Sequence, residues 1–386
     1  MGKATVRRLN LDELGELMNM LEVSYNYPKG FFQRHYPYLY RPECAGDSIF
    51  LVVDVDGRIV SHVGLFKMKA RVFGVEVDVG GIGGVATLPS ERGRGYMSML
   101  LNHAVRLMAD EGIPLSVLWG DRHRYGAFGW EVAGLKYVLY LTERAIARGG
   151  VKPIELTRAS WGSVDFLKRQ YGSLPLSVER RWECYGDGFS MDPMTIGSGE
   201  AEIWVSEHGY IISQPPSNQP HKPDIVEVAS ADGLEAELIA GYMKVKGLRR
   251  ALIHVNSQDP RLPRILKASS YYTAMPEASF RINSLYGFLK PFEGLLGVRA
   301  EEHGLKDYEA SLGLSLGGNV DYATIYVRGG SVSIVRGAEG RDVVVMDERD
   351  GVRLLLGGPM ATIPRALKPL STILPIPIHI PLLNYV

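Results

Sequence analysis

Cysteine is scarce in this sequence: only Cys44 and Cys184 occur among 386 residues, and they lie far apart along the chain. Neither belongs to a CxxC pair or has a partner at metal-ligand spacing, which argues against a disulfide framework and against a zinc site. We therefore expect two free thiols in a reducing cytoplasm, and no bound metal.

An excess of charge of one sign is also absent, since 43 lysine and arginine residues balance 43 aspartate and glutamate residues. This balance argues against binding of nucleic acid through bulk charge, although one local basic groove would be compatible with it. No stretch reaches the roughly 18 apolar residues of a membrane span, and the N-terminal sequence MGKATVRRLNLDELG lacks the apolar core of a signal peptide. The sequence therefore predicts a cytoplasmic protein without membrane or nucleic-acid partners.

What the chain does have is the composition of a globular protein, with 46% hydrophobic and 22% charged residues. Its length predicts two or three domains at about 150 residues each. Alternating apolar residues over 48–73, interrupted by Asp56-Gly57, predict an antiparallel hairpin, and a further strand follows up to Leu88. His62 falls within a predicted strand, so we expect it to be a structural histidine.

A strand, a turn and a helix at 85–112 form the most informative stretch. VATL ends a strand, PSERGRGY forms a turn, and MSMLLNHAVRLMADEG carries apolar residues at helical spacing. Small residues in such a turn leave backbone N–H groups uncovered at the positive end of the helix dipole, where a phosphate can bind. Arg92 and Arg94 would add charge-assisted contacts. The signatures of the P-loop and of the GxGxxG dinucleotide turn are both absent from this sequence.

Two motifs resemble those of the GCN5-related N-acetyltransferases, the GNAT superfamily. Arg92-x-x-Gly95-x-Met97 is similar to the coenzyme A pyrophosphate loop Q/R-x-x-G-x-G/A, with Met97 at the last small position. Further along, Tyr125 followed by Gly-Ala-Phe-Gly-Trp resembles the tyrosine and G-x-F-G-aromatic motif of the Eis branch of that superfamily. Two coupled motifs in the right order are far more specific than either one alone.

The resemblance implies an α/β (α+β) protein with tandem GNAT acyltransferase folds followed by a sterol-carrier-protein-like α/β domain. We place these domains at 1–148, 149–283 and 284–386, with a strand at 136–142 closing the first. The second domain lacks an R-x-x-G loop and is expected to be degenerate, with an unrelated α+β domain as the alternative. Eis relatives are hexamers, which implies a homo-oligomer here.

The resemblance also implies acetyl-CoA as cofactor and a primary amine as acceptor, either on a small molecule such as an aminoglycoside or on a protein lysine or N-terminus. The predicted cofactor contacts are Val85, Ala86, Thr87, Arg92, Gly93, Arg94, Gly95 and Tyr96. In the aromatic stretch 26–40, the predicted acceptor contacts are Asn26, Phe31, His35 and Tyr36. Burial of these side chains against the sheet is the alternative interpretation.

Direct transfer is expected, because no Ser/His/Asp or Cys/His constellation accompanies the turn. Tyr125 is the candidate general acid, since tyrosine is protonated at neutral pH. In Eis proteins the chain-terminal carboxylate lies in the active site, which implies Val386 as the base, with Asp121 and His123 as local alternatives. The apolar tail ILPIPIHIPLLNYV is expected to pack on the protein, either at this site or merely in an interface.

Two other functions stay open at this point. A non-catalytic CoA-binding or assembly protein could keep the fold, but loss of Tyr125 or of the Arg/Gly turn would be expected, and both are present. A peptidoglycan-type aminoacyltransferase would need an RNA-sized basic groove, which the balanced charge does not favour.

Overall fold

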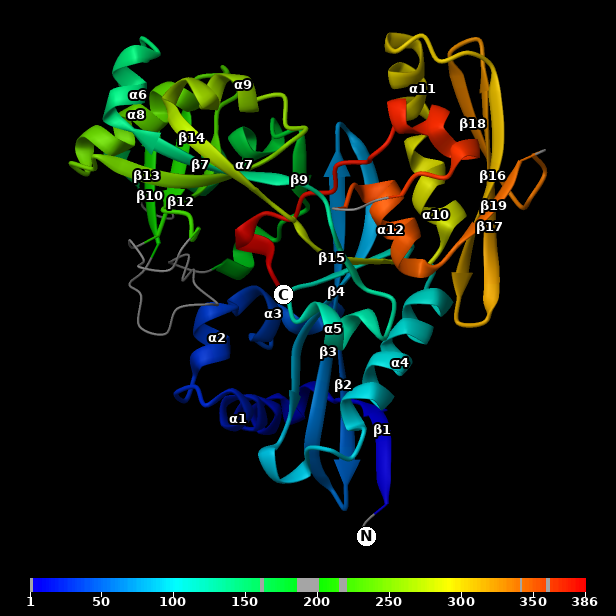
Figure 1. Ribbon diagram of the computed structural model, residues 1–386. Coiled ribbons are helices and arrows are strands. Elements are labelled where there is room, and N and C mark those ends of the chain that lie inside the picture. The colour runs from blue at the N-terminus through cyan, green and yellow to red at the C-terminus, as the bar shows by residue number, and fades with distance from the viewer. Residues whose placement is uncertain (1–2, 160–162, 186–200, 215–220, 341, 359–361) are drawn as a thin grey trace.

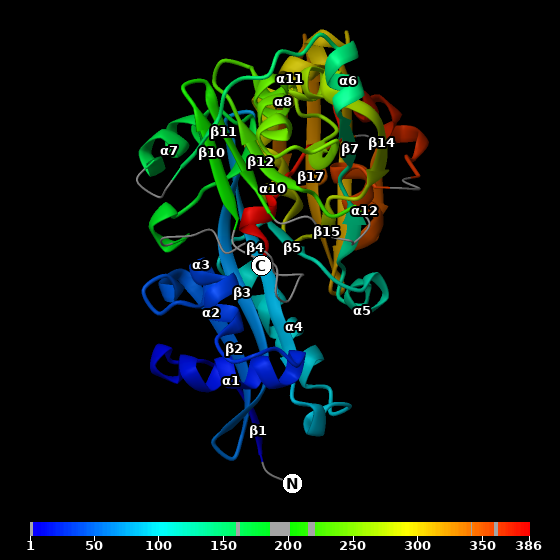
Figure 2. The ribbon, with the colours of Figure 1, turned by 90° about the vertical axis from the view of Figure 1, so that its left-hand side faces the viewer.

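The computed structural model describes residues 3–159, 163–185, 201–214, 221–340, 342–358 and 362–386. Three β-sheets organise this part of the chain, one at the N-terminal end and two at the opposite end (Figure 1). The C-terminus lies near the centre of the molecule in that view and in the view turned by 90° (Figure 2).

The first sheet has eight strands. They are β1 (Ala4–Arg8), β2 (Ser48–Val55), β3 (Arg58–Val72), β4 (Val75–Thr87), β5 (Leu115–Leu118), β6 (Glu131–Ala133), β9 (Leu176–Val178) and β15 (Ala278–Ile282). Seven follow the order β1-β2-β3-β4-β5-β15-β6, and β9 pairs with β3. Strands β1 to β4 are antiparallel, whereas β4 and β5 run parallel. The predicted hairpin joins β2 and β3, and positive φ angles of 51° at Asp56 and 80° at Gly57 fit a two-residue turn.

Helices cover both faces of this sheet (Figure 1). One face carries α1 (Leu14–Tyr25), α2 (Phe31–His35) and α3 (Pro37–Tyr40), and the other carries α4 (Tyr96–Asp110). Successive side chains of β2 point to opposite faces of the sheet, so both faces are apolar and need cover. Phe50 and Val52 pack with α1 to α3, while Leu51 and Val53 pack with α4. The short helix α5 (Arg122–Gly126) follows, with 3₁₀ turns at Leu11–Glu13, Ala45–Asp47 and Pro89–Glu91, whereas α6 (Glu143–Arg148) packs with the strands and helices of the second sheet.

The second sheet has seven strands in the order β14-β7-β13-β12-β11-β10-β8. Their bounds are β7 (Lys136–Thr142), β8 (Thr157–Arg158), β10 (Glu202–Ser206), β11 (Gly209–Ser213), β12 (Ile225–Ala229), β13 (Arg250–Asn256) and β14 (Ser269–Met275). Helices α7 (Val164–Gly172), α8 (Glu235–Val245) and α9 (Leu262–Ile265) belong to this unit, together with 3₁₀ helices at Trp182–Tyr185 and Leu266–Ala268.

The first two sheets exchange strands, which corrects one expectation. We expected the strand at 136–142 to close the first domain, but β7 pairs with β13 and β14 of the second sheet instead. In return β15, which follows the second unit along the chain, pairs with β5 and β6 of the first sheet. Pairing partners of a strand are set by packing that its own alternating sequence does not encode.

The third sheet has four strands in the order β18-β17-β16-β19. They are β16 (Tyr308–Leu316), β17 (Asn319–Arg328), β18 (Ser331–Arg336) and β19 (Val343–Met346). Its helices are α10 (Leu285–Leu289), α11 (Glu293–Glu302) and α12 (Glu348–Leu356), with 3₁₀ helices at Lys290–Phe292 and Arg365–Thr372. The 3₁₀ helix Leu382–Asn384 packs instead on the second sheet, where Leu383 joins the core that contains Tyr210 and Ile212. The apolar tail packs on the protein, as expected, because Ile376, Ile378, Ile380 and Leu383 are all buried.

Candidate functional site

A β-bulge interrupts β4 opposite β3. The pairing register shifts between His62 and Gly64, so β4 contributes an extra residue at Gly84–Val85. Gly84 has a φ of 58°, and a β-carbon there would collide with Tyr40 Oη, which explains the glycine. His62 is fully buried, and its Nδ1–H donates to Gly84 O at 2.7 Å. Burial lowers the pKa of His62 to about 4, so the ring is neutral and holds the bulge.

Next to the bulge, the pairing between β4 and β5 is short. It covers only Val79–Gly81 of β4 and Leu115–Val117 of β5. Beyond it, β4 continues to Thr87, while β5 ends at Leu118. The two strands therefore share no ladder where the bulge lies, and other elements can reach the backbone of β4 there.

The Arg/Gly turn joins β4 to α4, as predicted. Gly93 and Gly95 have φ angles of 79° and 77°, a backbone region that glycine adopts without strain. Helix α4 begins at Tyr96, with no side-chain cap and no acidic residue in its first turn. Its first N–H groups and the positive end of its dipole are therefore available to an anion.

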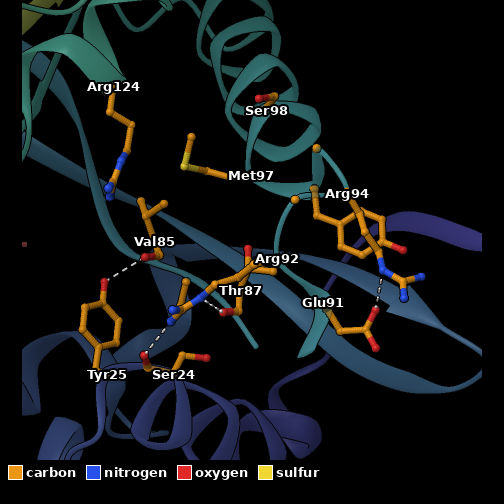
Figure 3. A pocket seen from close by; sticks show the side chains of 14 residues that line it. Ser24, Tyr25, Val85, Thr87, Glu91, Arg92, Arg94, Met97, Ser98 and Arg124 are labelled. Atoms are coloured by element: carbon orange, nitrogen blue, oxygen red, sulfur yellow. Dashed lines mark hydrogen bonds and ion pairs between the residues drawn. The ribbon is translucent and has the colours of Figure 1, made fainter. Parts of the chain in front are cut away.

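This turn forms one wall of a cavity of about 570 Å³, which we call the loop cavity (Figure 3). Its wall includes all eight residues predicted to contact the cofactor: Val85, Ala86, Thr87, Arg92, Gly93, Arg94, Gly95 and Tyr96. Met97, the last position of the motif, lines it as well, and the residues that the sequence did not indicate are Ser24, Tyr25, Glu91, Ser98 and Arg124. The structure thus brings the predicted cofactor residues together, and their contacts with a cofactor stay a prediction.

The two arginines of the turn differ in their partners. Arg92 donates to the carbonyl oxygens of Thr87 (3.3 Å) and Ser24 (3.2 Å), as Figure 3 shows. Arg94 forms an ion pair with Glu91, with 3.3 Å between Nε and Oε2. Arg92 therefore adds an uncompensated positive charge to the loop cavity, whereas the charge of Arg94 is partly neutralised.

A second, smaller cavity of about 190 Å³ shares Tyr25 and Val85 with the first. We call it the aromatic cavity. Its lining comprises Tyr25, Tyr27, Phe32, Tyr36, Tyr40, Ile82, Gly83, Gly84, Val85, Trp119, Tyr125, Tyr385 and Val386. Tyr25 Oη donates to Val85 O at 2.9 Å at the junction of the two cavities. Both predicted catalytic residues, Tyr125 and Val386, line this cavity.

Tyr125 reaches the aromatic cavity from α5. Asp121 caps this helix, because its Oδ1 accepts from the N–H of Arg124 at 2.7 Å. The Tyr125 side chain is buried, and this burial raises its pKa above the ordinary value of tyrosine. Asp121 and His123, the alternative bases, are exposed and line neither cavity.

Of the four predicted acceptor residues, only Tyr36 lines the aromatic cavity. Asn26 ends α1 in the left-handed conformation, with a φ of 57°. Phe31 and His35 are buried, and their rings pack against each other with centroids 4.2 Å apart. The alternative interpretation, burial of aromatic residues against the sheet, therefore describes Phe31 and His35 better.

The C-terminal residues enter between the sheets. Tyr385 stacks on Trp119 with ring centroids 3.8 Å apart, and its backbone oxygen accepts from Tyr38 Oη. Before it, Asn384 Oδ1 accepts from Arg180 at 2.9 Å. Val386 then lies over β4, where a β-carbon at Gly83 would stand 2.5 Å from its carboxyl carbon.

Glycines make this approach possible. Side chains alternate across a strand, so Gly81 and Gly83 share one face of β4. A β-carbon at Gly81 would stand 2.7 Å from the Val386 side chain, and Ile82 packs on the opposite face with α4. The sequence signal for this contact was the GGIGG run itself, which leaves one face of a strand without side chains.

A buried carboxylate ties α5 to the third unit. Glu131 is fully buried and accepts from Arg122 at 2.5 Å, from Arg349 at 2.6 Å and from Arg353 at 2.6 Å. Burial opposes its ionisation, but the hydrogen bonds from these arginines prevail and lower the pKa of Glu131 to about 2. Arg122 belongs to α5 and the other two to α12, so this cluster fixes the helix that carries Tyr125.

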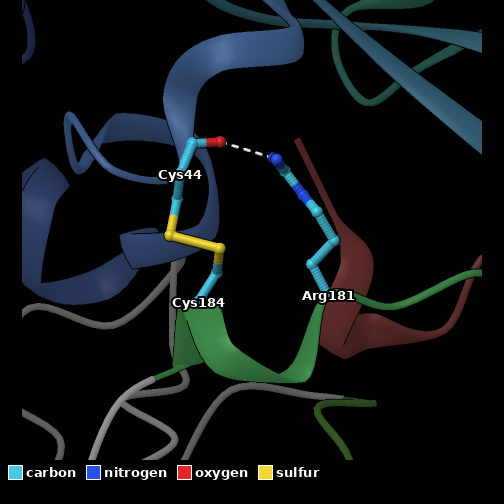
Figure 4. Close-up of a disulfide and its surroundings, with 3 residues drawn as sticks. All are labelled: Cys44, Arg181 and Cys184. Atoms are coloured by element: carbon cyan, nitrogen blue, oxygen red, sulfur yellow. Dashed lines mark hydrogen bonds between the residues drawn. A yellow bond between two sulfur atoms is a disulfide. The ribbon is translucent and has the colours of Figure 1, made fainter.

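The two cysteines contradict the expectation of free thiols, because Cys44 and Cys184 form a disulfide (Figure 4). Cys44 lies just after α3, and Cys184 lies in the 3₁₀ helix Trp182–Tyr185 of the second unit. Arg181 also donates to Cys44 O. A reducing compartment therefore no longer follows from cysteine usage, since intact disulfides occur in secreted proteins and in intracellular proteins of hyperthermophiles.

Within the described ranges, no three His, Cys, Asp or Glu side chains are grouped so that they could hold a metal ion. Among the helices that the structure describes, none has the length and apolar character needed to cross a membrane.

Comparison with known proteins identifies the N-terminal unit. Residues 5–133 match the family model of the acetyltransferase (GNAT) domain. A GCN5-related N-acetyltransferase from Kribbella flavida is 15% identical, with a TM-score of 0.73 and 100% of both chains covered. A GCN5-related N-acetyltransferase from Anabaena variabilis is 15% identical, with a TM-score of 0.68 over 100% of both chains. Eis1 from Mycobacterium abscessus is 14% identical, with a TM-score of 0.62 over 92% of this chain and 90% of its own.

At such identities these structures establish that the fold is shared over nearly the whole chain. No curated protein sequence gives a significant match.

Proposed function

Because residues 5–133 match the family model of the acetyltransferase (GNAT) domain, we propose that this protein is an acetyl-CoA-dependent N-acetyltransferase that moves an acetyl group directly to a primary amine. The observation that carries the proposal is the junction of the two cavities. A turn suited to phosphates lines one, Tyr125 and Val386 line the other, and both share Tyr25 and Val85.

The loop cavity fits coenzyme A. Its pyrophosphate would be held by the amides of 92–96, by the uncapped first turn of α4 and by the unpaired charge of Arg92. The cofactor supplies an acetyl group activated as a thioester. Met97, at the position that is small in the family motif, lines the cavity without closing it.

The proposed roles in the aromatic cavity follow from its chemistry. Tyr125 Oη gives a proton to the departing thiolate, and burial keeps that hydroxyl protonated. The Val386 carboxylate accepts a proton from the amine, directly or through water. Bulges leave backbone groups outside the ladder, so an N–H near Val85 would polarise the acetyl carbonyl.

Direct transfer is supported by the composition of both cavities. Neither a cysteine nor a histidine occurs among the described residues that line them. The serine and threonine hydroxyls of the loop cavity therefore have no imidazole beside them to activate a covalent step.

The same proposal includes the domain limits, the folds of the second and third units, the oligomeric state and the acceptor. The domain limits remain 1–148, 149–283 and 284–386, with the exchange of β7 and β15 across the first limit. The second unit would be a degenerate GNAT fold and the third a sterol-carrier-like domain, both consistent with the whole-chain likeness to the Kribbella flavida enzyme. We also propose that the protein forms a homo-oligomer. Its acceptor amine would be carried by a small molecule or by a protein.

The test is calorimetric titration with acetyl-CoA, followed by an assay of thiol release with a panel of amines. Wild type should bind, and Arg92→Glu should weaken binding by at least tenfold. Arg106→Glu is the matched control, because Arg106 is exposed on the same helix and lines neither cavity. Binding without turnover on any amine would favour the non-catalytic scaffold, and absence of binding by wild type would contradict the enzyme outright.

A further inference from the structure

Resting on the proposed function, we propose that the acceptor is a single primary amine at the end of a slim apolar or aromatic segment. An arylalkyl monoamine and a lysine side chain both have this chemistry. A polycation such as an aminoglycoside or a polyamine does not. The aromatic cavity carries this inference through its charge, its rings, its size and its neighbours.

The charge of the cavity suits one cation. None of the thirteen described residues that line it has a charged or imidazole side chain, so the terminal carboxylate of Val386 is the only charge among them. An ammonium group placed beside this carboxylate is stabilised, since an opposite charge compensates the loss of water. Any further ammonium group in the same cavity would lose its water without a carboxylate in return.

The rings of the cavity suit an apolar body. Eight of the thirteen lining residues are aromatic. The faces of Tyr and Trp rings attract a cation, and the same rings bury hydrocarbon favourably. Both tyrosines meet the bulge: Tyr25 Oη donates to Val85 O, and Tyr40 Oη lies against Gly84, where a β-carbon would collide with it. Their rings are thereby held in place as cavity walls.

The size of the cavity excludes large acceptors. Its volume of about 190 Å³ lies below the roughly 300–1,000 Å³ of pockets for drug-sized ligands. A multi-ring polyamine would have to extend beyond it. The walls at the bulge cannot recede, because His62, Tyr40 and the backbone of β4 are in contact there.

The neighbouring loop cavity repels additional positive charge. Arg92 and Arg124 line it, and the carboxylate that lines it, Glu91, is already paired with Arg94 and Arg58. A polycation centred on Val386 would therefore place charges on that side toward cations. On the side of the second unit, Val386 lines a third cavity of about 220 Å³, where Lys67, Lys69 and Arg180 are paired with Glu111, Asp78 and Glu227 and add no comparable repulsion.

The experiment measures kcat/KM by thiol release for four acceptors: 2-phenylethylamine, a peptide with one lysine, spermine and kanamycin. At least one of the first two should exceed both polycations by tenfold or more, and their order tells whether the amine comes from a small molecule or a protein. A polycation as the best acceptor would overturn this inference while leaving the proposed function intact. Failure of all four, with acetyl-CoA bound, would contradict the proposed function itself.

Tyr36→Glu tests the charge argument within the cavity, because it adds a second carboxylate to the wall. The variant should raise kcat/KM for spermine relative to 2-phenylethylamine by at least tenfold, while Tyr36→Phe, which keeps the ring, should leave that ratio within twofold of wild type. Tyr271→Glu places the same charge on an exposed tyrosine outside the cavity and should also leave the ratio unchanged. An unchanged ratio in Tyr36→Glu would contradict the inference.

Discussion

The carboxyl carbon of Val386 lies directly against Gly83, close enough that a β-carbon on Gly83 would stand 2.5 Å from it. The chain terminus and a strand 300 residues earlier are thus fitted to each other at a position where only glycine leaves room. The contact gives the terminal carboxylate a fixed place beside the bulge of β4.

Gly83→Ala should displace the Val386 carboxylate and leave the loop cavity unchanged. We expect kcat to fall by about 10- to 100-fold, because a misplaced reacting group costs rate steeply, while the affinity for acetyl-CoA stays within twofold. Gly294→Ala, in α11 where a β-carbon meets nothing within 4 Å, is the control and should be neutral or slightly stabilising. Equal kcat in Gly83→Ala and wild type would argue against the terminal carboxylate as base.

Tyr125→Phe should lower kcat by about 10²- to 10⁴-fold, the usual contribution of a general acid. Burial raises the pKa of Tyr125 above 10, so its proton is retained throughout the neutral and mildly basic range. In wild type, kcat should therefore show no decline from loss of this proton below about pH 10. The measurement is a pH–rate profile, and a basic limb near pH 8 that disappears in Tyr125→Phe would contradict it.

His62 should make stability depend on pH. Its folded pKa of about 4 lies below the ordinary value near 6.5, so between these values the unfolded state binds more protons. The stabilisation that depends on a neutral His62 is therefore fully present above pH 6.5. As pH falls toward 4, the free energy of unfolding decreases by about 3 kcal/mol.

His62→Phe removes this titration. Denaturant unfolding of both proteins between pH 7 and pH 4 should show the stability difference shrinking by that amount on acidification. If the unfolding free energies of the two proteins differ by the same amount at pH 7 and at pH 4, the lowered pKa of His62 is refuted.

Glu131→Gln should destabilise the protein by about 3–5 kcal/mol, because it leaves Arg122 and Arg349 without their counter-charge and Arg353 with Asp350 alone. Glu76→Gln, which breaks an exposed pair with Arg71, should cost less than about 1 kcal/mol. Since the cluster holds α5, kcat should fall in Glu131→Gln at temperatures where it stays folded. Equal unfolding free energies for the two variants would disprove the role of the cluster.

Reduction of the disulfide should lower the unfolding free energy by about 2–5 kcal/mol, as expected for a bridge that closes a long loop. Cys44→Ser with Cys184→Ser should match the reduced wild type. Thiol alkylation of the unreduced, denatured protein, followed by mass spectrometry, should label neither cysteine. Labelling of both would show that the thiols are free.

Local sequence predicted the parts of the site that local chemistry builds. The Arg/Gly turn, the start of α4 and the tyrosine of α5 depend on glycine, on helix periodicity and on a capping Asp121, all of which lie close together in sequence. The hairpin at Asp56-Gly57 follows from the same kind of signal.

Contacts between residues far apart in the sequence could not be predicted from those local signals. Trp119 and Tyr385 meet only because β5 ends beside the entering tail, and Tyr25 reaches the cavity from the end of α1. The pairing of the two cysteines likewise depends on how the second unit packs against α3. Alternating hydrophobicity predicted that 136–142 is a strand, but a strand carries no information about which sheet supplies its partners.

The exchange of β7 and β15 also separates the order of synthesis from the order of folding. When the ribosome has produced residues 5–133, β5 still exposes an unpaired edge and β6 has no neighbour, because β15 has not been made. The nascent N-terminal sheet must remain incomplete until Ile282 emerges, with an open edge in need of protection meanwhile. The second sheet, whose last strand β14 ends at Met275, therefore has all its strands before the first sheet does.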